Sequence, residues 1–312
     1  MPKVTIGVPV FNGSRFIERA VRCFLDQDFD DLEVIVADNA STDATLQICR
    51  SIASTDTRLR IVTSDSNRGA VPNYNRLLDH ARGTYFKWAA HDDWCTRDFV
   101  SAAVAALESQ KEAVLCYAPM GIEDDSGRVH RWLDQRLPDL ASDDAWRRLH
   151  ELIWSLRNPN PLIFGLMRTD VLRRTGRLPN TSQPDRALLN ELALHGPFLR
   201  VGAPRYIQYK SPTHYGHYAD EHVRPRLRSW VWLDAHNESK PKLSLYRFFR
   251  ANFDALKRAP TLSAWNYCAI TMEIIVGTLV TRVRSRRRLA SRRRGGAGAR
   301  MGRTGRSMPV NE

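Results

Sequence analysis

The sequence predicts an α/β protein with a Rossmann-like, mainly parallel sheet flanked by helices, and a helical extension toward the C-terminus. Two features of the first 118 residues support this prediction. Short apolar runs alternate with amphipathic stretches, and polar clusters follow three of those runs. With 312 residues, of which 43% are hydrophobic, the chain is long enough to bury one sizeable core.

The strands are predicted from their apolar periodicity. Val4, Ile6 and Val8 alternate with other residues, and residues 32–37 form the continuous apolar run of a strand that is buried on both faces. The expected strands cover residues 4–10, 32–37, 59–63, 84–90 and 113–117. Four helices are expected: one begins near Phe16, a second begins near Ser41, and the other two cover residues 73–81 and 97–109. This alternation favours parallel strands with helices on both faces of the sheet.

The second half of the chain has a weaker pattern. Asp125, Ser126 and Gly127 predict a hairpin turn, and residues 198–209 predict two short strands. Helices are expected over residues 143–156, 185–195 and 240–283. Residues 284–312, rich in Arg, Gly and Ala, are expected to be disordered.

The positive charge is concentrated at the C-terminal end. The formal net charge is +13, but residues 281–312 hold eleven Arg and only one acid, Glu312, so about +3 belongs to residues 1–280. A basic-tail nucleic-acid-binding protein is the alternative of a different class. The tail has no interleaved aromatic residues and the chain no recognised binding module, so no specific nucleic acid is expected.

The cysteines and the N-terminus favour a cytoplasmic protein. The five cysteines are scattered without Cys-x-x-Cys spacing, which is typical of reduced thiols. The first residues enter a predicted strand directly and lack the features of a signal peptide.

The polar clusters are expected to meet at one edge of the sheet. Residues 11–13, Asp38 with Asn39, and residues 91–93 each follow a predicted strand, and ligands of open α/β sheets bind outside the carboxyl ends of the strands. Neither a G-x-G-x-x-G nor a G-x-x-x-x-G-K-[ST] sequence is present, which disfavours ordinary dinucleotide and P-loop sites.

Four ordered segments carry a resemblance to family 2 glycosyltransferases with the GT-A fold. They read VTIGVPVFNGSRFIERAVRCFLDQ, LEVIVADNASTDAT, SNRGAVPNYNRLLDHARGTYFKWAAHDDW and QPDRALLNELALHG, within residues 3–205. The resemblance implies an inverting enzyme that moves a sugar from a nucleotide-diphosphate sugar to a hydroxyl of a glycan or lipid-linked acceptor. It implies four regions: a nucleotide-sugar-binding half (1–118), an acceptor-binding half of the same domain (119–235), a helical extension (236–283) and a tail (284–312).

The resemblance places a divalent metal, Mn²⁺ or Mg²⁺, at the third polar cluster. Asp93 matches the last acid of the family's D-x-D-like motif, with His91 as a further candidate ligand and Asp92 as a nucleotide contact. A metal there would neutralise the charge that develops on the leaving diphosphate. The alternative is that both acids cap the next helix. His91 departs from the motif, which leaves the identity of the metal open.

The same resemblance assigns the nucleotide pocket to the ends of the first strands. Pro9, Val10, Phe11 and Asn12 would line the base pocket, and Asp38 would accept a hydrogen bond from base or ribose. A carboxylate suits the N–H of a pyrimidine imide, which favours UDP or dTDP, with GDP still open. An Asx-turn, or an N-cap for the following helix, is the alternative role for Asp38. Arg68 would reach the nucleotide, unless it is a solvated surface residue.

Asp185 matches the family's general base at the start of a helix. It would take the proton of the acceptor hydroxyl, although Gln183 stands where the family often has Glu. Ser182 and Asp185 also fit a capping box. His214 and His217 are candidates for a loop at the diphosphate or the acceptor, against the alternative of plain surface.

The segment 262–294 combines a broad apolar helical stripe with a run of arginines. Such a helix can lie on an anionic cytoplasmic leaflet as part of a peripheral membrane protein, or it can pack on the catalytic domain. Glu273 interrupts the stripe and argues against a membrane span. Two further functions remain open for the whole chain: a nucleotidyltransferase and a degenerate nucleotide-sugar-binding protein.

Overall fold

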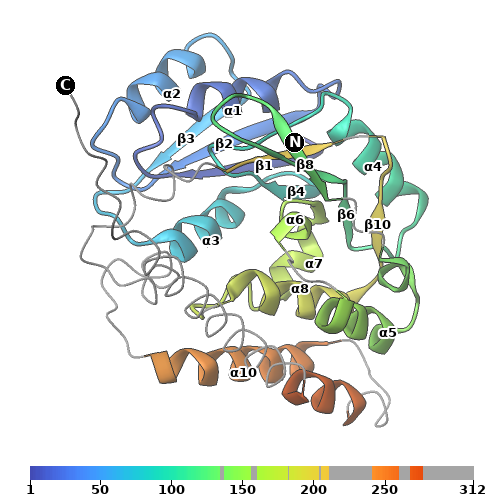
Figure 1. The fold of residues 1–312 in the computed structure, drawn as a ribbon. Helices are drawn as coiled ribbons and strands as arrows, with labels where there is room; N and C mark the ends of the chain where they lie inside the picture. Colours follow the sequence, from blue (N-terminus) through green and yellow to red (C-terminus); the bar gives the residue numbers. More distant parts are fainter. Residues whose placement is uncertain are drawn as a thin grey trace, which may run out of the picture.

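The computed structural model describes residues 1–133, 137–155, 160–181, 183–203, 205–210, 241–259 and 268–276. Within these residues the chain forms a seven-stranded sheet in the order β10-β6-β9-β4-β1-β2-β3 and a second sheet in the order β5-β11-β7-β8. Helices α1 and α2 cover one face of the large sheet, and α3, α6 and α8 lie on the other side, as Figure 1 shows.

The strands of the large sheet are short and mostly buried. They are β1 (Val4–Val10), β2 (Leu32–Asp38), β3 (Leu59–Thr63), β4 (Tyr85–Trp88), β6 (Leu115–Tyr117), β9 (Leu166–Arg168) and β10 (Phe198–Arg200). β1 pairs with β2 and β4 in parallel, and β2 pairs with β3 in parallel, so the predicted parallel arrangement of the first half is confirmed.

Most helices are close to their predicted positions, but the short helices α6 and α7 lie in a stretch where loops were expected. They are α1 (Ile17–Leu25), α2 (Thr45–Ala53), α3 (Ala70–His80), α4 (Phe99–Ser109), α5 (Ala145–His150), α6 (Asn160–Ile163), α7 (Thr169–Arg174), α8 (Pro184–His195) and α10 (Pro241–Arg258). A short 3-10 helix covers Pro138–Ala141, and a π-helical turn, Glu151–Ser155, extends α5.

Strand β9 is the main departure from the predicted topology. It lies between β4 and β6 and is antiparallel to both. Its three residues are too few to show periodicity, and the sequence around them is rich in proline. The pattern therefore predicted loops where the chain adds a central strand.

The second sheet combines a predicted hairpin with two strands from elsewhere. β7 (Met120–Glu123) and β8 (Val129–Leu133) pair across the turn at Gly127, whose φ is 74°. β11 (Tyr206–Tyr209) lies between β7 and β5 (Trp94–Cys95). This sheet brings Tyr206 and Tyr209 beside the polar cluster at residues 91–93.

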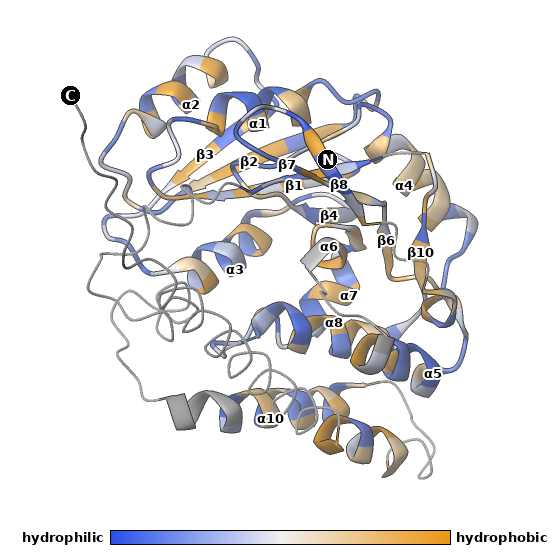
Figure 2. Cartoon of the chain, viewed as in Figure 1, coloured by the Kyte–Doolittle hydropathy of each residue, from blue (hydrophilic) through white to orange (hydrophobic). Residues whose placement is uncertain are grey.

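The C-terminal helical residues pack on α5 and α8. A second apolar cluster joins α5, α8, α10 and the helical residues 268–276, and its buried members are Leu149, Leu194, Ala255, Leu256, Ile270 and Ile274. Glu273 bonds Nδ1 of His150 at 2.9 Å and accepts a hydrogen bond from Trp154. Figure 2 shows the mixture of apolar and polar residues along α10. None of the described helices is both long and apolar enough to cross a bilayer.

Candidate functional site

The loops that follow β1 and β2 are tied to each other. The N–H of Asn12 donates to Oγ of Ser41 at 2.9 Å, and the Asn12 side chain accepts from the N–H of Thr42 at 2.8 Å. Asn12 adopts a φ of 50°, a conformation that asparagine tolerates better than most residues. The N–H of Asn39 donates to the carbonyl of Val10 at 2.9 Å. These bonds hold both predicted nucleotide segments as one rigid edge.

Asp38 lies at the end of β2, opposite Val10 in the sheet register. Its side chain is buried, and Oδ2 accepts a hydrogen bond from the N–H of Ser41 at 3.1 Å. Oδ1 is buried and has no hydrogen-bond partner among the described residues. One oxygen thus makes a local bond to the loop after β2, and the other is a buried acceptor at the carboxyl edge of the sheet.

The loop around Arg68 is held beside Asp38 by Asn39. Oδ1 of Asn39 accepts from the N–H of Arg68 at 3.0 Å, and its amide donates to Asn67 at 2.7 Å. The Arg68 side chain is exposed. Arg76, on α3, donates to the backbone carbonyl of Asp38 at 3.1 Å. Burial first, and then Arg68, lower the pKa of Arg76, so two cations face the same corner of the sheet.

Pro9 and Val10 are buried within β1, whereas Phe11 is half-buried in the loop that follows. Of these three residues, Phe11 is therefore the one that is accessible at the carboxyl end of β1.

Residues 91–93 follow β4 at the same edge. A methyl group on Gly13 would lie 2.5 Å from Cδ2 of His91, so the His91 ring packs directly on the loop after β1. His91 and Asp92 are half-buried, whereas Asp93 is buried. The structure therefore joins the first and third polar clusters, as the strand order predicted.

Both oxygens of Asp93 accept hydrogen bonds from β11. The hydroxyl of Tyr206 donates to Oδ2, and the N–H of Tyr209 donates to Oδ1 at 3.0 Å. Burial, and then the charge of Asp92, raise the pKa of Asp93 well above its usual range. Of the two acids, Asp92 is the one that a ligand reaches from solvent.

A buried lysine lies under this cluster. Lys87, on β4, is fully buried, donates to the carbonyl of Phe164, and has Nζ 4.8 Å from the centre of the Tyr206 ring. Burial lowers its pKa to about 8. Lys210 follows β11 and is half-buried, and the charge of Asp93 partly offsets the lowering of its pKa by burial.

Asp185 occupies the first turn of α8, on the side of the sheet opposite α1 and α2 (Figure 1). It is half-buried, and burial raises its pKa, while hydrogen bonding to backbone N–H groups lowers it. A raised pKa suits a group that accepts a proton. His214 and His217 lie outside the described residues, so their predicted place is not seen.

Sequence reasoning missed Lys87, Arg76, Tyr206 and Lys210. A lysine inside an apolar strand and the Tyr-Ile-Gln-Tyr-Lys run were the available signals. Their proximity to Asp38 and Asp93 depends on strand pairing between distant segments, which no local pattern reports.

The family model described as "Glycosyl transferase family 2" matches residues 5–163. A Campylobacter jejuni GalNAc(5)-diNAcBac-PP-undecaprenol beta-1,3-glucosyltransferase is 32% identical over 108 residues, which are 34% of this chain and 34% of that protein. A Bacillus subtilis putative teichuronic acid biosynthesis glycosyltransferase, TuaG, is 33% identical over 31% of this chain and 38% of its own length. The chain thus matches little more than a third of the length of these curated relatives.

Solved structures resemble the fold over a longer span. Staphylococcus aureus TarS 1-349, in complex with UDP, has a TM-score of 0.55 at 18% identity and covers 82% of this chain and 71% of that one. The mannosyltransferase PcManGT from Pyrobaculum calidifontis, in complex with GDP-Man and Mn²⁺, has a TM-score of 0.53 at 18% identity and covers 89% and 86%.

Proposed function

The chain belongs to glycosyl transferase family 2 and has the GT-A fold, and on that premise we propose a specific reaction for it. The enzyme moves a sugar from a nucleotide-diphosphate sugar to a hydroxyl of a glycan or lipid-linked acceptor, with inversion at the anomeric carbon. The observation that carries the proposal is the convergence of Asp38, His91, Asp92 and Arg68 at one sheet edge. This edge therefore holds a hydrogen-bond acceptor for the base, a carboxylate for the metal and a cation for the phosphates.

The donor nucleotide is UDP or dTDP in this proposal. Within the described part of the chain, Oδ1 of Asp38 is buried with no hydrogen-bond partner, and the N–H of a pyrimidine imide is a donor that would satisfy it. TarS was solved with UDP, whereas PcManGT was solved with GDP-Man, so relatives of this fold use both kinds of nucleotide. The phenyl ring of Phe11 supplies an apolar surface beside the base, and Arg68 supplies charge for the diphosphate.

The donor set at residues 91–93 fits a divalent metal that also takes ligands from its substrate. No group of three or more His, Cys, Asp and Glu in the described part of the chain forms a metal cage. Mg²⁺ and its relatives are commonly held by one or two carboxylates plus substrate phosphates. Burial, and then the charge of Asp92, raise the pKa of Asp93, and a cation would relieve the repulsion between the two carboxylates. When bound, the metal neutralises charge on the leaving diphosphate.

We assign the main ligand position to the half-buried Asp92, with His91 beside it. Asp93 was the residue expected from the motif, and it remains a candidate ligand. Its two oxygens already accept hydrogen bonds from β11, so in this proposal it also holds the loop in place. Lys210 adds a half-buried cation near the same carboxylate.

Asp185 acts as general base in the proposed transfer. Its carboxylate takes the proton of the acceptor hydroxyl as that oxygen forms a bond to the anomeric carbon. The bond between the anomeric carbon and the diphosphate oxygen breaks, and the nucleotide diphosphate leaves with the electron pair. Attack from the face opposite the leaving group inverts the carbon.

We propose the acceptor class from the names of two relatives, and the cellular location from the helical residues 268–276. The names of the Campylobacter jejuni enzyme and of TuaG refer to a lipid-linked glycan and to teichuronic acid. Met272 is 59% exposed and Val276 is 39% exposed on the helical residues 268–276. We propose a cytoplasmic enzyme for cell-envelope glycan or glycolipid synthesis that meets an anionic membrane surface through this region.

Calorimetric titration with UDP, dTDP and GDP, with Mn²⁺ or with a chelator, tests the assignment. We expect metal-dependent binding of one pyrimidine nucleotide, lost in Asp92→Asn and weakened in Asp38→Asn. Asp170→Asn, an exposed aspartate on α7, is the matched control and should bind as wild type does. Binding of no nucleotide by folded protein would refute the active transferase and favour a degenerate nucleotide-sugar-binding protein. Incorporation of nucleotide into a sugar phosphate would instead favour a nucleotidyltransferase.

A further inference from the structure

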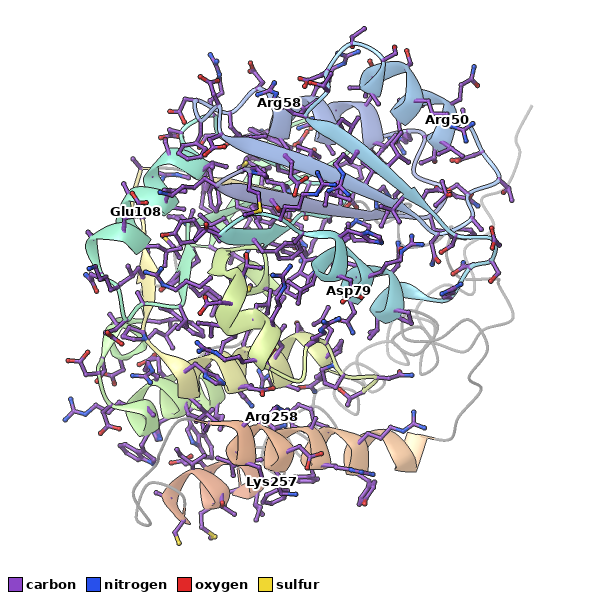
Figure 3. All side chains as sticks on the ribbon, turned by 180° about the vertical axis from the view of Figure 1, so that it is seen from behind. Arg50, Arg58, Asp79, Glu108, Lys257 and Arg258 are labelled. Atoms are coloured by element: carbon purple, nitrogen blue, oxygen red, sulfur yellow. The ribbon has the colours of Figure 1, made fainter. Side chains whose placement is uncertain are left out.

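An arginine-lined groove separates α8 from α10. Its volume is about 280 Å³, and its lining includes Arg177, Arg247, Arg250 and Arg258 together with Glu191 and Asp254. None of these residues belongs to the cluster at the carboxyl edge of the sheet. Figure 3 labels Arg258 at the boundary between α10 and α8.

Two of the four arginines are each ion-paired with a carboxylate. Arg258 binds the buried Glu191 through Nε at 2.7 Å and Nη2 at 3.1 Å. Nη1 of Arg177 bonds Asp79, on α3, at 2.6 Å. These ion pairs hold two walls of the groove in place. The positive charge that they do not neutralise comes from Arg247 and Arg250.

The remaining pair of arginines carries an excess of positive charge. Asp254 is shared between Arg250, at 3.7 Å, and Lys257, at 3.3 Å. Arg247 is half-buried, and no described residue makes a hydrogen bond or ion pair with it. Because Arg247 and Arg250 are three residues apart on α10, their side chains project from the same face of the helix. The groove therefore holds two guanidinium groups with donors to spare.

The groove begins at the helix that carries the proposed base. Thr181 and Ala187 line it on either side of the first turn of α8, which contains Asp185. Arg177 stands at the same end with a φ of 57°, a conformation that is rare for residues other than glycine. The groove therefore lies beside the first turn of α8, and Asp185 itself is not one of its lining residues.

We propose that this groove binds an oxyanionic group of the acceptor, a phosphate or a carboxylate, through Arg247 and Arg250. The planar fork of arginine matches both groups, and the uncompensated charge favours an anion over a neutral sugar. That the bound molecule is the acceptor rests on the proposed function. That the groove binds an anion does not depend on the proposed function.

Two charged probes and their neutral counterparts test the proposal on the full chain. Glycerol 3-phosphate and glucuronate are titrated by calorimetry beside glycerol and glucose, with and without saturating UDP and Mn²⁺. We expect the charged probes to bind in both conditions and the neutral ones not to bind. Arg247→Gln/Arg250→Gln should weaken binding by at least about tenfold, because it removes both charged hydrogen-bond donors. Arg50→Gln, an exposed arginine on α2 that Figure 3 labels far from α10, is the control.

The outcomes separate this proposal from the transferase assignment. Unchanged affinity in the double variant, loss of probe binding when UDP is present, or equal binding of neutral probes would overturn the groove as an anion site. Preference between the two charged probes would identify phosphate or carboxylate as the group. The double variant should still bind UDP as wild type does, so a failure of nucleotide binding would count against the proposed function alone.

Discussion

The hydroxyl of Tyr206 donates a hydrogen bond to Oδ2 of Asp93, joining β11 to the loop after β4. The two residues are separated by 113 positions in the chain. Because Oδ1 of Asp93 accepts from the N–H of Tyr209, the carboxylate is satisfied entirely by the second half of the catalytic domain. Formation of the candidate metal loop therefore depends on docking of β11.

The Asp93→Asn variant should keep its stability and lose ligand affinity. The amide oxygen can accept from the N–H of Tyr209 and the amide nitrogen can donate to the oxygen of Tyr206, while the cost of a buried charge disappears. We expect an unchanged free energy of unfolding, or a gain of about 1 kcal/mol, in the absence of metal. Urea unfolding measures this, and nucleotide titration with Mn²⁺ should show weaker binding.

Tyr206→Phe is the comparison variant for that experiment. It leaves Oδ2 of Asp93 buried without its donor, which should cost about 1–3 kcal/mol of unfolding free energy. Equal destabilisation by both substitutions would mean that Asp93 is charged and well paired without metal, contrary to the raised pKa.

Lys87 should make the protein more stable as the pH rises from 8 to 10.5. Burial lowers the pKa of Lys87 to about 8 from its usual 10.5. Between these values the folded protein binds fewer protons than the unfolded chain, so the free energy of unfolding increases with pH. The gain attributable to Lys87 is at most roughly 3 kcal/mol.

Comparison with Lys87→Met isolates this effect, because other groups titrate in the same range. Unfolding free energies of both proteins are measured by urea at pH 7.5, 9 and 10.5. The free energy of unfolding of the wild type should increase relative to that of the variant as the pH rises. Parallel pH profiles would show that Lys87 keeps an ordinary pKa.

Cys23 should be more reactive at neutral pH than the buried cysteines. Its Sγ lies 3.2 Å from the carbonyl oxygen of Cys95, and the contact with the Cys95 thiol is the main cause that lowers its pKa to about 7. Burial raises the pKa of Cys49 and Cys116 to about 12. Thiolates, not thiols, are the reactive species, so partly exposed Cys23 should be alkylated first.

Iodoacetamide labelling followed by peptide mapping measures this order in a Cys268→Ser background, since Cys268 is exposed. The labelling rate of Cys23 should reach half its maximum near pH 7 and move to higher pH in Cys95→Ala. A rate for Cys23 no greater than that of Cys49 at pH 7 would contradict the expectation.

Arg258→Met should destabilise the protein by about 3 kcal/mol, because it leaves the buried carboxylate of Glu191 without its ion-pair partner. Lys257→Met, at the exposed neighbouring position that Figure 3 also labels, should stay within about 0.5 kcal/mol of wild type. Denaturant unfolding compares the two. If Glu191→Gln/Arg258→Met is as unstable as Arg258→Met alone, the loss is one of packing and not of the buried charge.

Local patterns in the sequence predicted much of the edge that holds the candidate site. The alternation in β1 and the apolar run in β2 located Asp38 and Asn12 at strand ends, and the strand order brought His91 beside Gly13. The Asx-turn and the pocket were both predicted for Asp38, and its two oxygens have separate environments. The roles assigned to Asp38, Arg68, Asp92, Asp93 and Asp185 remain predictions.

The sequence by itself determined the α/β class, the order of the first elements and the family. These depend on periodicity and on short motifs of residues that are adjacent in the chain. Only the tertiary structure showed that β9 enters the sheet antiparallel, that Tyr206 binds Asp93, and that Arg247 faces a groove beside α8. Each of these depends on contacts between segments far apart in the chain. Strands of three or four residues and single polar side chains carry too little local preference to specify such partners, so packing of the whole domain decides them.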